Sequence, residues 1–145
     1  MEQTKPITRD EFDTWVFQMD DVLDEFLAGL PAAVSTQLDY SLDSLDVLEK
    51  WILENYPSVK DLEKEDAVLP SDSFARYIGE TVQKNLGGYW DIDLENDKNP
   101  YYNLPVIVEY KENASPICPH KLVAEAAALK KGTYMKSVLK TIQSE

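Results

Sequence analysis

The feature that most constrains the fold is a change of hydrophobic period within one unbroken stretch, residues 71–94 (SDSFARYIGETVQKNLGGYWDIDL). Apolar side chains first recur every four residues, at Phe74, Ile78, Val82 and Leu86. This spacing predicts a helix with one inward face. After two glycines the period becomes two, which is typical of a half-buried strand. A helix followed at once by a strand therefore forms the centre of the predicted domain.

The ends of this central helix have their own signals. Ser71 or Asp72 is predicted to cap its first turn, because a short polar side chain accepts hydrogen bonds from free backbone N–H groups. Gly87 is predicted to end it, because glycine takes the left-handed cap conformation without strain. In the strand, Trp90, Ile92 and Leu94 share one side, and Tyr89, Asp91 and Asp93 share the other.

A second strong helix signal lies near the N-terminus. Thr8 and Glu11 have the spacing of a capping box. The apolar positions that follow at helical spacing are Phe12, Trp15, Val16, Met19, Val22, Leu23, Phe26 and Leu27. With Gly29 as the stop, they predict one continuous helix of about 20 residues.

The segment between these two helices is less regular. Residues 37–40 have the composition of a short extended segment, and a helix is expected to begin at Ser41 or Ser44. Tyr56-Pro57 ends that helix, because proline disfavours helical geometry in the residue before it. Residues 58–70 are expected to form a short helical turn or loop that Pro70 closes.

The C-terminal part predicts a hairpin and two more helices. Residues 104–110 (LPVIVEY) are rich in β-branched side chains, and the polar stretch 95–103 connects them to the first strand. Helical spacing returns over residues 120–130 and 133–143. The predicted fold is a mostly helical α+β single domain, residues 1–145, with a small antiparallel hairpin or sheet packed by helices. Its predicted shared core contains Trp15, Phe26, Trp51, Phe74, Ile78 and Trp90.

Charge is distributed unevenly along the chain. The formal net charge is -13, and the whole excess lies in residues 1–72, with 18 acidic and 5 basic side chains. Residues 111–145 reverse the balance, with six lysines against three glutamates. Such polarity steers a basic partner toward the N-terminal half. The candidate interaction residues are Asp20, Asp21, Asp24, Glu25, Asp61, Glu63, Glu65 and Asp66.

The sequence offers little for metal or covalent chemistry. Cys118 and His120 are the only thiol and the only imidazole, whereas a structural zinc site needs four such ligands. The base of a cysteine enzyme normally comes from a distant segment, not from two residues away. No glycine-rich phosphate loop or nucleophile motif is present. We therefore expect no metal, no cofactor and no enzymatic activity.

One alternative is a ligand pocket between the central helix and the hairpin. An ion pair between Arg76 and Glu80, one helical turn apart, is the simplest role for Glu80. A buried, unpaired Glu80 would instead have a raised pKa and become a candidate acid or base. The residues proposed for such a pocket are Tyr77, Glu80, Tyr89, Asp91 and Tyr101.

Composition also excludes or disfavours several environments. A nucleic-acid binder needs a basic stripe, which an acidic chain with a modest lysine excess at one end does not supply. No apolar run approaches the roughly 20 residues needed to span a bilayer. The first residues (MEQTKPITRDEF) lack the apolar core of a signal peptide, and one cysteine suits a reducing compartment, so a cytoplasmic location is expected.

Three segments together resemble a group of small bacterial proteins of unknown function. They are Tyr40–Leu45 (YSLDSL), Tyr77–Glu80 (YIGE) and Gly87–Trp90 (GGYW), in this order. The resemblance implies a fold of this kind and carries no catalytic residue. Some small acidic bacterial proteins are immunity proteins that block a toxin, which is an analogy only.

The sequence thus favours a non-enzymatic acidic interaction module, an immunity or regulatory protein with a basic partner. The alternatives are an enzyme or ligand binder at the Glu80 pocket, and self-association of the acidic half with the lysine-bearing half of another copy.

Overall fold

The computed structural model describes residues 8–145. The elements are α1 (Arg9–Phe17), α2 (Met19–Ala28), α3 (Ala32–Ser35), α4 (Ser44–Asn55), α5 (Val59–Leu62), the 3-10 helix η1 (Glu65–Ala67), α6 (Val68–Asn85), β1 (Tyr89–Asp91), β2 (Val106–Val108), α7 (Pro119–Leu129) and α8 (Tyr134–Ser144). The two strands form one antiparallel sheet. The expected α+β class, mostly helical with a small antiparallel sheet, is confirmed.

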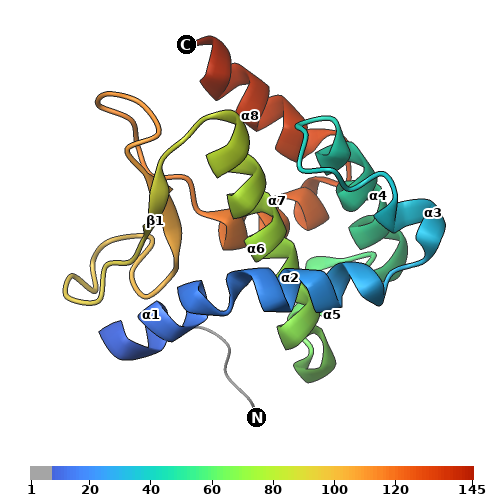
Figure 1. Cartoon of the computed structure of the whole chain (residues 1–145). Helices are drawn as coiled ribbons and strands as arrows, with labels where there is room; N and C mark the ends of the chain where they lie inside the picture. The colour runs from blue at the N-terminus through green and yellow to red at the C-terminus, as the bar shows by residue number, and fades with distance from the viewer. Residues whose placement is uncertain (1–7) are drawn as a thin grey trace.

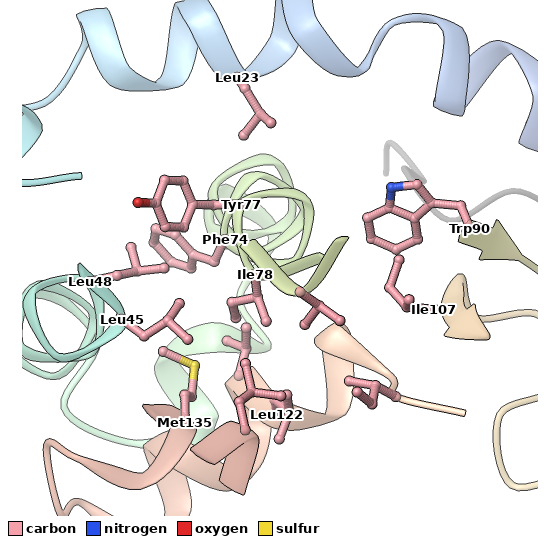
Figure 2. Close-up of a cluster of buried hydrophobic side chains, with 14 of the residues drawn as sticks. Leu23, Leu45, Leu48, Phe74, Tyr77, Ile78, Trp90, Ile107, Leu122 and Met135 are labelled. Carbon is pink, nitrogen blue, oxygen red and sulfur yellow. The ribbon is translucent and has the colours of Figure 1, made fainter. Parts of the chain in front are cut away.

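Helix α6 is the centre of the molecule. Figure 1 shows α1 and α2 crossing in front of α6, α7 behind it, and β1 beside it on the left, because the chain turns back after the C-terminal end of α6. Helix α8 packs on α4 and α7. Figure 2 looks nearly along α6 and shows side chains converging on it from α2, α4, α7 and the strands. Phe74 and Ile78 of α6 are at most 1% exposed. All six residues predicted to share one core do so, although Phe26 and Trp51 are only partly buried.

The helix-to-strand transition after α6 occurs as predicted. Gly87 has φ +100°, and its N–H bonds to the Gln83 carbonyl in a left-handed helix end. Gly88 also has to be a glycine, because a Cβ at this position would lie 2.5 Å from the Val108 carbonyl oxygen. In β1, Trp90 is buried and Tyr89 exposed, which confirms the alternation.

The register of the two-stranded sheet places two buried side chains opposite each other. Trp90 pairs with Ile107 in β2, and Ile107 also bridges to Ile117.

The start of α6 differs from the prediction. The helix begins at Val68, so Ser71 and Asp72 lie inside it and do not cap it. Pro70 lies in the first turn and does not end the preceding segment. Proline is tolerated there because the N–H it lacks would have no partner within the helix. Asp72 is instead buried within the second turn of α6.

The predicted single N-terminal helix is also interrupted, because α1 ends at Phe17 and α2 begins at Met19. Neither proline nor glycine explains the break. Arg76 of α6 donates from Nη1 to the Trp15 carbonyl oxygen at 2.8 Å. In an unbroken helix that oxygen accepts from the Met19 N–H. A side chain inserted into the hydrogen-bond ladder is a recognised cause of a kink, so the interruption is a tertiary effect.

Smaller differences occur elsewhere. Residues 37–40 form turns and no extended segment, with Tyr40 at φ +64°. Thr8 caps α1 as predicted, since the Glu11 N–H donates to its hydroxyl. The Glu11 carboxylate accepts from that hydroxyl and not from the Thr8 backbone N–H, so the capping box is only half formed. Gly29 ends α2 as predicted, but with φ -84° and not in the left-handed region. Within residues 8–145, no helix combines the length and apolarity required to cross a membrane.

Candidate binding cleft

A cleft of about 970 Å³ opens between the N-terminal helices and the first turns of α6. One wall comes from α1 and α2, through Trp15 and Phe26, and the opposite wall from the start of α6, through Leu69. Trp51 and Tyr56 close the end that faces α4. Helix α2 crosses α6 here (Figure 1), and the cleft lies between the two helices.

Aromatic rings line the interior of the cleft. The Phe74 ring meets Phe26 edge to face, with centroids 5.7 Å apart, and Tyr56 in the same manner at 5.8 Å. Such rings stabilise one another. Phe74 is buried behind the other two, and Phe26 and Tyr56 are partly exposed in the cleft lining. Leu69 adds an aliphatic side chain that is 60% exposed. This cleft therefore suits an apolar group.

Carboxylates surround the same opening. Asp10, Glu11 and Glu25 line it, and all three are exposed. A second, more open hollow of about 620 Å³ lies beside it and is lined by Asp21, Asp24 and Glu25 among others. The two hollows share Gln18, Val22 and Glu25, so they form one acidic strip along α2.

A buried polar cluster forms the inner boundary of the cleft. Asp72 Oδ1 accepts a hydrogen bond from Trp15 Nε1 at 2.9 Å, and Asp72 Oδ2 accepts one from Arg76 Nε at 2.8 Å. The Arg76 guanidinium also lies 4.2 Å from the centre of the Trp15 ring. Arg76 also donates to the Trp15 backbone carbonyl. Its guanidinium therefore contacts a carboxylate, a carbonyl oxygen and an aromatic ring.

His120 completes this cluster from the start of α7. Its Nε2 lies 3.4 Å from Asp72 Oδ1, and neither ring nitrogen has a hydrogen-bond partner among the described residues. Burial is the largest influence on Asp72 and by itself raises its pKa. The neighbouring His120 and Arg76 outweigh that effect, so the net pKa of Asp72 lies below its usual value. Asp72 is therefore an ionised structural group that holds α1 against α6.

Sequence reasoning missed this cluster. It paired Arg76 with Glu80, which is wrong because Arg76 pairs with Asp72 one turn in the other direction. Both carboxylates are four residues away, and the sequence alone does not distinguish them. Glu80 Oε2 instead accepts a hydrogen bond from Trp90 Nε1 at 3.1 Å.

The five residues of the alternative pocket have separate surroundings. Tyr77 is fully buried, with its hydroxyl 2.7 Å from that of Ser44. Tyr89 is exposed and donates to Glu109, while Asp91 pairs with Arg9 across a long 3.6 Å contact.

The last member, Tyr101, lies beneath the Lys121 ammonium, 5.7 Å from the ring centre. None of the five lines the cleft described above.

The candidate interaction residues fall into two groups. Asp20, Asp21, Asp24 and Glu25 are exposed on α2, and Glu63, Glu65 and Asp66 are exposed around η1. Asp61 is different, because its carboxylate accepts from Ser58 in a capping box and from Lys64. Hydrogen bonds from Lys64 and Ser58 lower its pKa. Asp61 is thus already engaged within its own turn.

The cysteine and histidine do not combine with other ligands. Cys118 is the buried residue just before α7, and burial raises the pKa of its thiol. Within residues 8–145, no three His, Cys, Asp or Glu side chains are grouped so that they could hold a metal ion.

Comparison with known proteins gives no family assignment. No family model, curated protein or solved structure matches the chain. The resemblance to small bacterial proteins therefore stays a prediction, and the function rests on the geometry of the cleft and the charges around it.

Proposed function

We propose that the protein is a non-enzymatic interaction module that binds a basic partner protein through α1 and α2. The surface used is called here the acidic face, and it consists of Asp10, Asp13, Asp20, Asp21, Asp24 and Glu25. The observation that carries the proposal is that all six are exposed and none makes an ion pair with another residue in the range 8–145.

Uncompensated charge of one sign has a specific physical consequence. Exposed carboxylates contribute little to folding stability, so their clustering is not explained by the fold. Their combined field attracts a positively charged surface and accelerates its encounter with the protein. The only arginine of α1, Arg9, pairs with Asp91 of β1 and with no carboxylate of the acidic face.

An immunity or regulatory role in the cytoplasm fits this mode of binding. Such a protein acts by covering the positive surface of a toxin or enzyme, and it needs no catalytic group of its own. The single cysteine is buried and free, which suits a reducing compartment.

The test compares two variants that remove the same charge. Asp20, Asp21 and Asp24 are changed to asparagine in one, and E95Q/D97N/E112Q is the matched control, on exposed carboxylates in the second half of the chain. Each protein is immobilised and exposed to lysate from the native cell. The basic protein retained by the wild type is then identified, and its association kinetics are measured.

We expect the triple change of Asp20, Asp21 and Asp24 to asparagine to slow association with the partner about tenfold at low salt. The control variant should keep the wild-type association rate. Raising the ionic strength from about 0.05 to 0.3 M should slow the wild type and bring the two rates together. A retained protein that binds all three forms equally, and equally at both salt concentrations, would remove the acidic face from the mechanism.

A further inference from the structure

The acidic face borders the aromatic cleft, because Glu25 belongs to both. A partner that uses both surfaces needs positive charge and an apolar side chain. We infer that the cleft receives a basic amphipathic segment of the partner, with an apolar side chain inside and lysine or arginine on the rim. The inference rests on the proposed function and adds the chemistry of the bound segment.

The interior of the cleft supplies the apolar part of the site. Phe26 and Tyr56 line the cleft with partly exposed rings, and each packs edge to face on the buried Phe74 ring. Leu69, on the opposite wall, is 60% exposed. An aliphatic or aromatic side chain placed between them would remove this surface from water, which is the main source of affinity at interface centres.

The rim supplies the electrostatic part. Glu25 lines both the cleft and the neighbouring hollow, and Asp21 and Asp24 extend the negative surface along α2. Asp10 and Glu11 of α1 line the same cleft. Among the described residues, Arg76 is the one cation in the cleft lining, and it is already bound to Asp72 and the Trp15 carbonyl, so it does not neutralise the rim. Charge complementarity therefore requires a basic segment and disfavours an acidic or neutral one.

The test uses a defined probe. It is a short helical peptide, blocked at both ends, with leucine on one face and lysine on the other. One control peptide replaces each leucine with serine, and a second replaces each lysine with glutamate. Binding is measured by fluorescence anisotropy, and the indole N–H resonances are followed by NMR. Trp51 lines the cleft, whereas Trp90 donates to Glu80 and does not line it.

We expect the leucine–lysine peptide to bind about tenfold more tightly than the serine–lysine peptide, and the glutamate peptide to bind undetectably. The Trp51 resonance should shift while that of Trp90 stays in place.

Two protein variants test the location of the site. Leu69→Lys places a charge on the apolar wall, and Leu129→Lys is its matched control, since Leu129 is 49% exposed on α7 and outside the cleft. Gly29→Phe adds bulk at the cleft edge, where a Cβ meets no atom closer than 3.5 Å. Both cleft variants should reduce binding of the leucine–lysine peptide about tenfold, and Leu129→Lys should not. Thermal melts establish that each variant is folded.

The outcomes separate this inference from the proposed function. If both lysine-bearing peptides bind equally, and Leu69→Lys matches Leu129→Lys, the cleft is not the site, and this inference is wrong. If the asparagine variant of α2 still weakens the native partner, the acidic face remains the binding surface. Sedimentation of the protein alone gives the third outcome: a salt-sensitive dimer abolished by Leu69→Lys would make a second copy the occupant and overturn the assignment to a partner protein.

Discussion

At the scale of single residues, the Asp72 side chain links α1 to α6. Its two carboxylate oxygens bind Trp15 and Arg76, and Arg76 in turn binds the Trp15 backbone, so three residues fix α1 on α6. A buried carboxylate is stable only when it is paired in this way, and removing one partner leaves an uncompensated charge. The acidic residues of α2 contribute to the surface field, whereas Asp72 contributes to the fold.

The depressed pKa of Asp72 predicts how stability depends on pH. The unfolded chain protonates this group near pH 4, and the folded chain does so at a lower pH. The folded state therefore binds fewer protons in that interval, and the stability that Asp72 provides is full above about pH 4 and lost below it. Asp72→Asn should cost about 3 kcal/mol near neutral pH, and the difference from wild type should shrink as the pH falls below about 4.

Urea unfolding across this pH range measures the effect. Asp24→Asn serves as the control, because Asp24 is exposed and its change should alter stability by no more than about 0.5 kcal/mol. A difference for Asp72→Asn that stays constant down to about pH 2.5 would contradict the assignment of a depressed pKa.

At the scale of elements, buried contacts between distant segments decide how the helices meet. Glu49 of α4 is fully buried, and its two oxygens accept the backbone N–H groups of Tyr134 and Met135. It therefore caps α8 from another helix and satisfies groups that α8 cannot satisfy itself. Gly79 of α6 decides how closely the sheet packs. Because it has no Cβ, the Trp90 ring of β1 can lie directly against the helix backbone.

Gly79→Ala should move α6 and β1 apart. A Cβ at this position would lie 2.0 Å from Cζ2 of Trp90, far inside van der Waals contact. We expect a loss of about 1–3 kcal/mol, although alanine is the better helix former. Gly29→Ala is the control, because its Cβ meets nothing closer than 3.5 Å, and its stability should be unchanged or slightly increased. Urea unfolding followed by circular dichroism compares them, and equal stability of Gly79→Ala and wild type would disprove the close contact.

At the scale of the whole molecule, one apolar core coexists with a strongly asymmetric surface. The core extends from Phe12 to Leu139 and includes every long helix and both strands. The surface has its excess negative charge in the first half of the chain, at a net charge of -13. Because burial of apolar area dominates stability, the exposed charge is available for association at little cost to the fold.

Phe74 is the best single test of this shared core. It is 1% exposed and touches rings from α2 and from the end of α4. Phe74→Ala should cost about 3–5 kcal/mol in unfolding free energy. Phe17→Ala is the matched control, since Phe17 is 87% exposed and its loss should cost no more than about 0.5 kcal/mol. A thermal melt that shows no loss for Phe74→Ala would mean that α6 is not the centre of the core.

The sequence by itself determined where most of the longer helices and the two strands form, and which faces they bury. Hydrophobic period is a local property, so α4, α6, β1 and the six core residues follow from it directly. The exposed acidic face on α2 follows from the same periodicity.

Only the tertiary structure decided the remaining features. Arg76 has a carboxylate four residues away on each side, and packing against Trp15 selects Asp72 over Glu80. The same arginine interrupts the N-terminal helix, and the cleft lies where α2 crosses α6. These features depend on contacts between residues about sixty positions apart, and local periodicity carries no information on such contacts because they form only when the helices pack.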